Sequence, residues 1–519
     1  MIYSTARLRC QKQRLKRNPP IKLRTCIHSV LAVLISLAGF QTMADQHQPP
    51  VGKTTSMWGF TPDRNLVSDE TDLPTEWDAE SGQGIKWVVE LGSQTYAGPV
   101  VHDGKVFVGT NNQATYNPKL TGDRGVIAAF NEEDGQFLWQ ITHTKLTSGR
   151  VNDWPQQGVC STPFIEGDRL YYISNRCQVV CVDTEGFLDG ENDGPHKDEV
   201  ETSLIDGDII WIYEMMDELD VFPHNLATCS PVGAGDLLFV ETSNGVDEGH
   251  IHIPSPLAPS FIALKKETGE LVWEDDSPGG HILHGQWANP AYAVIDNHPQ
   301  VVFPGGDGWL YSFQPDNGEL IWKFDCNPKD AEWELGGRGT RNSIIATPVI
   351  HHNRVYIGVG QDPEHGEGDG HLWAIDATQT GDVTESGVIW HFGGQDFNRT
   401  MSTVAILQSH QPEVASRIGH AGLLFVADLS GFVYCLNVDT GERYWTYDTF
   451  AAIWGSTFVA DGKVYIGDED GDVVILAAEK EKKVLFETNM GSAVYTTPVA
   501  HDGVLYIAGR NKLFAIHNQ

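Results

Sequence analysis

The sequence is poor in basic residues. Its 519 residues include 35 Lys or Arg against 70 Asp or Glu, which gives a net charge of −35 at pH 7. A field of that sign repels the phosphates of nucleic acids and anionic lipid headgroups, so we expect neither as a partner. The charge does not identify the partner that does bind, because an acidic surface also serves solubility.

Cysteine is also scarce, and no two cysteines are adjacent. The absence of any CxxC or CxxCH motif excludes the usual redox, zinc-ribbon and c-type haem attachment signatures. The cysteines after residue 44 could pair in an exported protein, but sequence does not show how. They are Cys160, Cys177, Cys181, Cys229, Cys326 and Cys435.

Long apolar runs are missing except for CIHSVLAVLISLAGF at 26–40. This run follows a start with eight Lys or Arg and no acid, and precedes TMA at 42–44. The order is typical of a secretory signal, and the run is short for a transmembrane helix. We therefore predict a signal peptide over 1–44 and an exported protein, periplasmic or extracellular, with no membrane span after signal removal. A retained anchor is the alternative; a lipoprotein site is not indicated, because Cys26 begins the run.

What the sequence does contain is a repeat. CLNVDTGERYW (435–445) recurs as ALKKETGELVW (263–273), SFQPDNGELIW (312–322) and AFNEEDGQFLW (129–139), each with a Gly four residues before a Trp. Short runs rich in Val, Ile, Leu, Tyr and Phe between turn residues predict β-strands. Three kinds of strand recur eight times, and the third kind carries Trp87, Trp139, Trp211, Trp273, Trp322, Trp390, Trp445 and, in the eighth place, Phe486.

A fourth strand, marked by Pro and small residues as in STPFI (161–165), precedes each unit. Four strands in eight units predict an all-β fold, an eight-bladed β-propeller of four-stranded antiparallel blades over 84–519. The last unit ends at KLFAIHNQ without a Trp strand, whereas GIKWVVEL (84–91) precedes the first. We therefore predict that this N-terminal strand completes the last blade and closes the ring. Residues 45–83 form an extension packed on the ring.

The spacing small-x-polar-x-x-(Thr/Asn/Asp)-Gly-x-x-x-Trp resembles the tryptophan-docking repeat of the quinoprotein alcohol dehydrogenases. The wider pyrroloquinoline-quinone-like (PQQ-like) propeller repeat family shares it and includes non-catalytic scaffolds of bacterial outer-membrane assembly. The resemblance covers about residues 58–519, and the long loops GGRGTRNSIIATPV and GQDPEHGEGDGHLW resemble those of exported propellers from planctomycete-type bacteria.

The resemblance implies two alternatives for function. The first is an exported binding or scaffold propeller that acts through its pore-side loops on a protein, a glycan or a small planar ligand. The second is a dehydrogenase of alcohols or sugars that depends on PQQ and calcium. The catalytic branch carries a disulfide between adjacent cysteines that stacks on the quinone, and this chain has no such pair. The family's calcium ligands cannot be matched residue by residue, so the first alternative is favoured.

Long loops at one end of the pore hold the candidate ligand-binding residues. Arg, aromatic and amide groups converging on a pore mouth would suit a planar, anionic or carbohydrate-like ligand. The alternative is that they bond to loop backbone and bridge blades. The candidates are Gln157, His224, Asn225, His284, Gln286, Trp287, Arg338, Arg341, Asn342, Arg399, Trp454 and Tyr495.

Metal signals are weaker. In DGENDG (189–194), Asp189, Glu191 and Asp193 begin like a calcium loop, but Val200 stands where the closing Glu of an EF-hand would be, which leaves at most a minimal calcium clip. HILH (281–284) and HIH (250–252) are not specific for a metal in loops. The sequence shows no hydrolase triad order and no phosphate-binding Gly loop, so we assign no catalytic residue.

Overall fold

The computed structural model describes residues 55–364, 366, 368–409, 416–420 and 422–518. The chain divides into residues 1–51 and 52–519, and only the second part contains described residues. The predicted signal peptide, 1–44, and the first residues of the predicted extension, 45–54, lie outside the described residues. Among the described residues, no helix has the length and apolar character needed to cross a membrane.

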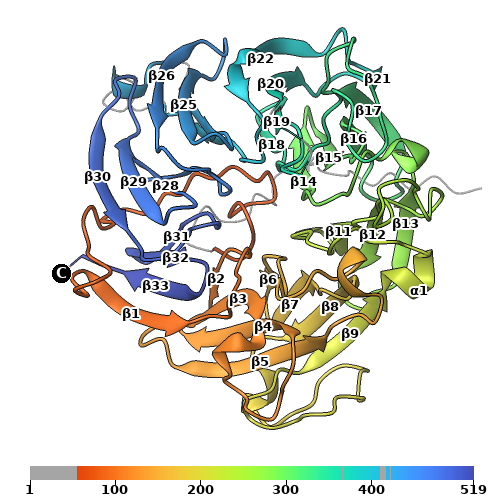
Figure 1. The fold of residues 1–519 in the computed structure, drawn as a ribbon, viewed down its shortest axis with the longest axis vertical. Helices are drawn as coiled ribbons and strands as arrows, with labels where there is room; N and C mark the ends of the chain where they lie inside the picture. Colours follow the sequence, from red (N-terminus) through yellow and green to blue (C-terminus); the bar gives the residue numbers. More distant parts are fainter. Residues whose placement is uncertain (1–54, 365, 367, 410–415, 421, 519) are drawn as a thin grey trace, which may run out of the picture. The chain divides into compact units, whose positions relative to one another are not determined.

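Eight antiparallel sheets stand around a central axis, which confirms the predicted eight-bladed β-propeller (Figure 1). The first four blades, from inner to outer strand, are β2 (Val100–His102), β3 (Lys105–Asn111), β4 (Arg124–Asn131) and β5 (Phe137–Thr144); β6 (Phe164–Glu166), β7 (Arg169–Ile173), β8 (Gln178–Asp183) and β9 (Ile209–Glu214); β10 (Val232–Ala234), β11 (Leu237–Glu241), β12 (Phe261–Lys265) and β13 (Leu271–Asp275); and β14 (Ala291–Ile295), β15 (His298–Pro304), β16 (Trp309–Phe313) and β17 (Leu320–Asp325), which gains the parallel strand β21 (Gly381–Asp382).

The other four blades follow in chain order. They are β18 (Val349–His351), β19 (Arg354–Val359), β20 (Asp369–Asp376) and β22 (Val388–Asn398); β23 (Ala405–Leu407), β24 (Leu423–Ala427), β25 (Phe432–Asn437) and β26 (Arg443–Asp448); β27 (Phe458–Ala460), β28 (Lys463–Gly467), β29 (Asp472–Ala477) and β30 (Val484–Asn489); and β31 (Val499–His501), β32 (Val504–Ala508), β33 (Lys512–Ile516) and β1 (Ile85–Glu90). The connections include the short helix α1 (Met215–Leu219) and the 3₁₀ turns η1 (Asn112–Ala114), η2 (Gly149–Val151), η3 (Gly186–Leu188) and η4 (Gly279–His281).

The ring closes through its two chain ends, as the sequence predicts. Strand β1 pairs with β33, so that Trp87 lies opposite Ala515 and Glu90 opposite Lys512. In Figure 1 the orange strand β1 lies beside the blue strand β33. Because the outermost strand of the last blade comes from the start of the ring, the first and last blades cannot separate without breaking this pairing.

The Trp of an outer strand packs on the next blade. Trp211 of β9 donates its indole N–H to the carbonyl of Lys266 at 3.0 Å. A Cβ added to Gly269 would lie 2.6 Å from the ring of Trp211, and Gly269 has φ +72, where a side chain is also strained. The repeated Gly and Trp are therefore the two halves of a blade junction. The indoles that donate to a carbonyl of the following blade are Trp87, Trp139, Trp211, Trp273, Trp390 and Trp445.

Residues 55–70, which we call the strap, form hydrogen bonds with all eight blades. The N–H of Ile165 donates to the carbonyl of Ser56, and the N–H of Tyr292 to that of Pro62. The segment runs through the middle of the ring (Figure 1). The strap residues that make these bonds, in order of the blades, are Thr55, Ser56, Arg64, Pro62, Asp63, Asn65, Leu66 and Glu70.

Arg64 anchors the strap and is itself fully buried. Its guanidinium donates to three carbonyls, those of Trp58 at 2.6 Å, Ser230 at 2.9 Å and Pro290 at 2.8 Å. Burial lowers the pKa of Arg64 to about 10, so the side chain stays charged at neutral pH. One cation thus ties the strap to two blades.

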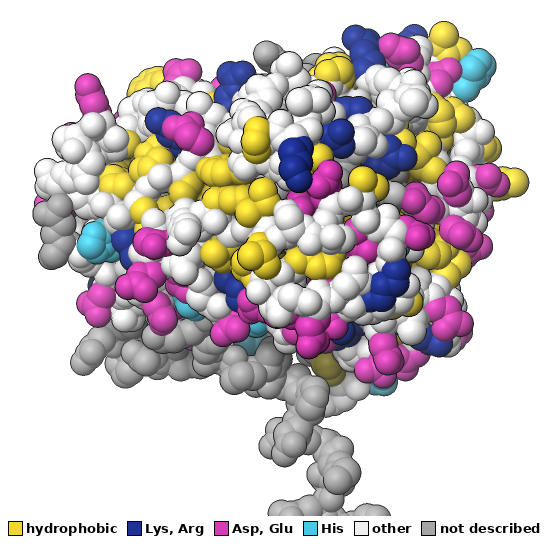
Figure 2. All heavy atoms as spheres, turned by 90° about the horizontal axis from the view of Figure 1, so that it is seen from below, with side chains coloured by type: hydrophobic (Ala, Val, Ile, Leu, Met, Phe, Trp, Pro, Cys, Tyr) yellow, Lys and Arg dark blue, Asp and Glu magenta, His cyan; other side chains and the backbone are white. Residues whose placement is uncertain are grey.

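Acidic side chains are spread over the outside of the ring. On the face seen in Figure 2, Asp and Glu are dispersed among fewer Lys and Arg. This distribution accords with the twofold excess of acids in the sequence, 70 against 35.

Candidate functional site

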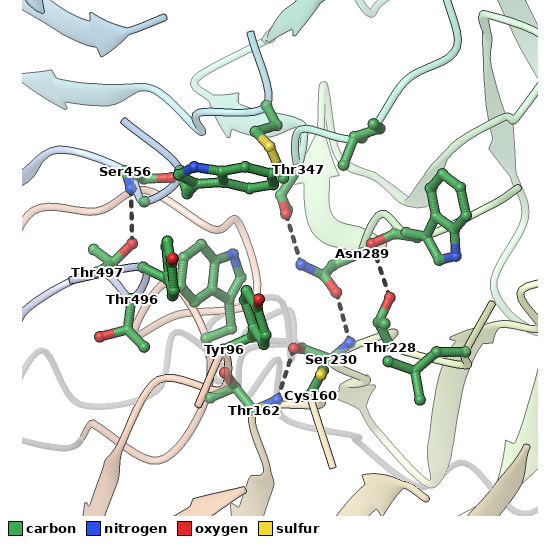
Figure 3. Close-up of a pocket in the computed structure, with 18 of the residues that line it drawn as sticks. Tyr96, Cys160, Thr162, Thr228, Ser230, Asn289, Thr347, Ser456, Thr496 and Thr497 are labelled. Atoms are coloured by element: carbon green, nitrogen blue, oxygen red, sulfur yellow. Dashed lines mark hydrogen bonds between the residues drawn. The ribbon is translucent and has the colours of Figure 1, made fainter. Parts of the chain in front are cut away.

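A polar residue just before each inner strand bonds to the next blade. The main-chain N–H of Thr347 donates to the hydroxyl of Thr403 at 3.1 Å, and that of Thr403 donates to the hydroxyl of Ser456 at 2.9 Å. Figure 3 shows further bonds of this ring through labelled side chains. We call these eight positions the pore ring; they are Gly98, Thr162, Ser230, Asn289, Thr347, Thr403, Ser456 and Thr497.

The residue two positions before each member of the pore ring lines a pocket of about 470 Å³. Alternate residues of an extended chain point to the same side, so this second set forms a layer above the pore ring. Four of its eight members are aromatic. The layer consists of Tyr96, Cys160, Thr228, Trp287, Ile345, Met401, Trp454 and Tyr495.

The strap supplies the floor of the pocket. Trp58 lines the pocket, and its ring lies 3.9 Å from where a Cβ of Gly98 would be. Gly98 is the one member of the pore ring without a side chain, so the ring has room for the indole there. The indole N–H of Trp58 is buried and has no hydrogen-bond partner among the described residues.

Loops from three blades form the mouth. They contribute Trp154 and Gln157, Asn225 and Leu226, and the segment from Asp362 to Glu364. The amide of Asn225 lies 3.5 Å from a carboxylate oxygen of Glu364, which joins two of these loops across the mouth.

The pocket is aromatic and carries no positive charge. Its lining has no Lys or Arg, and its charged members are Asp362 and Glu364. Burial raises the pKa of the Cys160 thiol to about 12 and that of the Tyr96 hydroxyl to about 12, so both are neutral at physiological pH. A negatively charged ligand would therefore meet two carboxylates without a compensating cation.

Two predicted site residues lie in a histidine cluster beside the pocket. The rings of His224 and His284 have centroids 4.4 Å apart, and each lies 4.9 Å or less from the ring of His250. Trp287 packs edge-on against His284 and donates its indole N–H to the carbonyl of His224. Burial lowers the pKa of His224 to about 3, so this side chain is neutral.

Five of the predicted ligand-binding residues line the pocket, namely Gln157, Asn225, Trp287, Trp454 and Tyr495. The rings of Tyr495 and Tyr96 stack with centroids 5.1 Å apart, and Trp454 meets Tyr495 edge-on at 5.9 Å. These contacts place one aromatic wall at the junction of the seventh, eighth and first blades.

The other predicted residues lie outside the pocket lining and hold loops. Gln286 is buried and donates to the carbonyl of Asn244 and the hydroxyl of Ser260. Arg341 makes two bonds to the carboxylate of Asp325, at 3.1 and 2.7 Å.

Three more predicted residues also bond to loop backbone or loop amides. Asn342 exchanges bonds with Asn327. Arg338 donates to the carbonyl of His250, and Arg399 donates to the carbonyls of Asp362 and Pro363. Arg338 and Arg399 therefore brace the loops that carry His250 and the mouth carboxylates.

The predicted calcium clip is only partly assembled. The carboxylates of Asp189 and Asp193 come within 4.8 Å of Asp183 at the end of β8, and Glu191 is not part of this group. Burial raises the pKa of Asp183 to about 6. The sequence contains no signal that would place Asp183 with the DGENDG loop.

The six cysteines of the described part are free thiols, and Cys177 and Cys181 are not bonded to each other. The pocket therefore has no disulfide that could stack on a quinone. The metal-ligand groups of the described part are the three histidines and the three aspartates above. The group beside the pocket offers imidazole nitrogens, which do not suit calcium, an ion that takes oxygen ligands.

Sequence reasoning missed half of the pocket layer and the whole floor. Tyr96, Cys160, Thr228, Ile345 and Met401 stand two residues before the polar residue of motifs such as STPFI, so that spacing could have found them. Trp58 has no such signal, because the strap does not share the repeat.

Comparisons with known proteins agree with this geometry. The sequence pattern of the family described as outer membrane protein assembly factor BamB matches residues 41–145, 123–388 and 368–517. A polyvinylalcohol dehydrogenase from a Pseudomonas species is 32% identical over 109 residues, 18% of this chain and 17% of that enzyme, so the match spans under a fifth of the relative.

Solved structures show the same ring. A computationally designed protein, Ika8, superimposes with a TM-score of 0.52 at 13% identity, over 83% of this chain and 99% of the other. BamB from Moraxella catarrhalis gives a TM-score of 0.49 at 14% identity, over 83% and 96%. At these identities the likeness concerns the fold. Because the family pattern matches most of its length, the chain belongs to the PQQ-like propeller-repeat family that the assembly factor BamB represents.

Proposed function

We propose that the protein is a binding propeller whose pore pocket takes a small, polyhydroxylated ligand without negative charge, such as a segment of a neutral glycan. The observation that carries the proposal is the lining, in which Trp58, Trp154, Trp287, Trp454, Tyr96 and Tyr495 surround a space of about 470 Å³ without any Lys or Arg.

The chemistry of the lining selects this class. The C–H faces of a sugar ring pack on aromatic faces, and its hydroxyls bond to amides and carboxylates. The mouth provides both, in Gln157, Asn225 and Glu364, and the floor adds the indole N–H of Trp58. A volume of about 470 Å³ lies within the range of small-molecule sites, about 300 to 1,000 Å³.

The alternative, a dehydrogenase that depends on PQQ and calcium, fits the described residues poorly. PQQ carries carboxylates, whereas the charged residues of the pocket lining are Asp362 and Glu364. The catalytic family's cysteine pair is absent, and the ligand group beside the pocket is made of nitrogens. The match to a polyvinylalcohol dehydrogenase is too short to transfer an activity, although its substrate is also a polyhydroxylated chain.

Tryptophan fluorescence titration tests the proposal, with neutral oligosaccharides of increasing length and short polyvinyl alcohol as probes. We expect saturable binding by the wild type and at least a tenfold weaker affinity for Trp454→Ala, because an aromatic contact of this kind contributes about 1 to 3 kcal/mol. Trp333→Ala is the matched control, since Trp333 is exposed and does not line the pocket.

Absence of saturable binding to every probe, or equal affinities for wild type and Trp454→Ala, would refute the proposal. A parallel titration with PQQ and calcium, followed by dye reduction with alcohols, separates the two functions. Binding and turnover there would favour the dehydrogenase. Export, periplasmic or extracellular, stays a prediction from residues 1–44.

A further inference from the structure

Three loops bring His224, His250 and His284 together beside the pocket. His224 lies between α1 and β10, His250 between β11 and β12, and His284 between β13 and β14. Their ligand atoms lie within 4.8 Å of one another, although the residues are 26 or more positions apart in sequence. Two of the three are almost fully buried, each with 1% of its surface exposed.

The hydrogen bonds fix which nitrogen of each buried ring carries the proton. Nδ1 of His224 lies 2.8 Å from the carbonyl of Val246, which can only accept, so Nδ1 is the donor. Nδ1 of His284 lies 2.8 Å from a carboxylate oxygen of Asp362. Each neutral ring therefore presents the lone pair of Nε2, the form that binds metals.

Nε2 of His224 is buried without a hydrogen-bond partner among the described residues. A hydrogen bond between Nε2 of His250 and Nε2 of His284, 3.3 Å apart, would account for those two atoms but not for the third. A buried lone pair without a donor is costly, about 1 to 3 kcal/mol, unless something else binds it.

The spacing suits a tetrahedral metal ion. Zn–N bonds of about 2.0 to 2.1 Å at tetrahedral angles put ligand nitrogens about 3.3 to 3.4 Å apart. The distance between Nε2 of His284 and Nε2 of His250 is 3.3 Å. His250 is the least buried ligand and lies on a loop, so it can adjust most easily.

The surroundings are those of a metal site with an open position. A carboxylate on one ring and a backbone carbonyl on another are the partners that orient metal-binding histidines. Glu364, with its side chain 48% exposed, has a carboxylate oxygen 3.8 Å from Nε2 of His284 and lines the pocket. The fourth ligand position therefore faces the pocket, where Glu364 or water can fill it.

We propose that His224, His250 and His284 bind one divalent transition-metal ion of the zinc class, with its fourth position directed at the mouth of the pore pocket. Imidazole donors favour zinc, copper, nickel or cobalt over calcium and magnesium, which take oxygen ligands. The site does not depend on the pocket being a glycan site, and it would add a Lewis-acidic contact for a ligand hydroxyl or carbonyl.

The test uses the untagged full chain after chelation, titrated calorimetrically with Zn²⁺ and followed spectroscopically with Co²⁺. We expect one ion per chain and the intense visible absorption of tetrahedral cobalt. His250→Ala should lose at least tenfold in zinc affinity, and Asp362→Asn about 10- to 100-fold, because orienting partners contribute that much. His281→Ala is the control, because His281 precedes the cluster in HILH but is exposed and outside it.

Circular dichroism of each variant verifies that the chain is folded, and the wild type should melt at a higher temperature with zinc than without. The proposal is wrong if the folded wild type binds no zinc, or binds it with an affinity that His250→Ala leaves unchanged. An octahedral cobalt spectrum would also contradict it.

Discussion

At the scale of single residues, the interior of this ring holds acids whose ionisation the fold opposes. Asp307 is buried, accepts a hydrogen bond from the hydroxyl of Tyr311 at 2.7 Å and another from the N–H of Trp309. Burial raises the pKa of its carboxyl to about 6. The hydrogen bonds keep the side chain in place in either form, so its protonation changes stability without removing its contacts.

Asp307→Asn should expose this ionisation as a pH dependence. An unfolded Asp ionises near pH 3.9, about two units below the folded value, so the folded chain holds the extra proton between the two. Stability from that proton is present at about pH 4 and is lost as the pH rises through about 6. The free energy of unfolding of the wild type, relative to the variant, should fall by about 3 kcal/mol between about pH 4 and about pH 7.

Urea unfolding of both proteins across this range measures that difference. Other titrating groups occur in both chains and cancel. A difference that stays flat, or rises with pH, would show that Asp307 ionises in the fold as it does in the unfolded chain.

At the scale of elements, the blade junction is the unit that the repeat encodes. Gly269 and Trp211 meet across one junction, and Gly441 and Trp390 meet in the same way across another, where an added Cβ would lie 2.7 Å from the ring. Because each Gly accepts an indole from the blade before it, the repeat describes pairs of neighbours rather than isolated blades.

Gly269→Ala should therefore destabilise the ring more than an equally twisted Gly that faces open space. Gly235 has φ +54 and no atom within 4 Å of an added Cβ. We expect Gly235→Ala to cost about 1 to 2 kcal/mol for its backbone alone, and Gly269→Ala about 2 to 4 kcal/mol, because it also overpacks the indole. Thermal and urea unfolding compare the two, and equal costs would contradict the junction model.

The strands and the ring closure could be predicted because their signals are local and recur. Gly and Trp keep a fixed spacing, and Trp87 stands ahead of the first unit where the last unit lacks its Trp. The pore ring was also within reach, since its polar residues follow a small residue before each inner strand. The prediction used those motifs for strand order only and did not read the residue two positions earlier.

The histidine cluster could not be predicted, because its geometry depends on three loops from different positions in the chain. His284 was singled out within HILH together with His281, yet its partners are His224 and His250. Spacing along one loop cannot show which imidazole faces which. Likewise, Arg341 looked like a ligand-binding residue, but its partner Asp325 carries no motif.

At the scale of the whole molecule, the strap makes the ring a cup. A propeller pore is open at both ends unless something fills one of them, and here residues 55–70 bond to all eight blades while Trp58 lines the pocket. The strap could not be predicted from sequence beyond its existence as an extension. Its partners are main-chain groups of the inner strands, which have no sequence signature.

Arg64→Ala tests whether the strap belongs to the folding unit. The change leaves the carbonyls of Trp58, Ser230 and Pro290 without their donor in a buried site, at about 1 to 3 kcal/mol each. We expect the free energy of unfolding to fall by at least about 3 kcal/mol in one cooperative transition.

Arg443→Ala is the matched control, because Arg443 pairs with Asp396 on the surface, at 3.4 Å and with both side chains exposed. Such a pair contributes at most about 1 kcal/mol. If Arg64→Ala instead unfolds in two steps, with Trp58 fluorescence changing before the sheets melt, the strap is a separable lid and the floor of the pocket is a moving part. If it costs no more than Arg443→Ala, the many backbone bonds of the strap hold it without its cation.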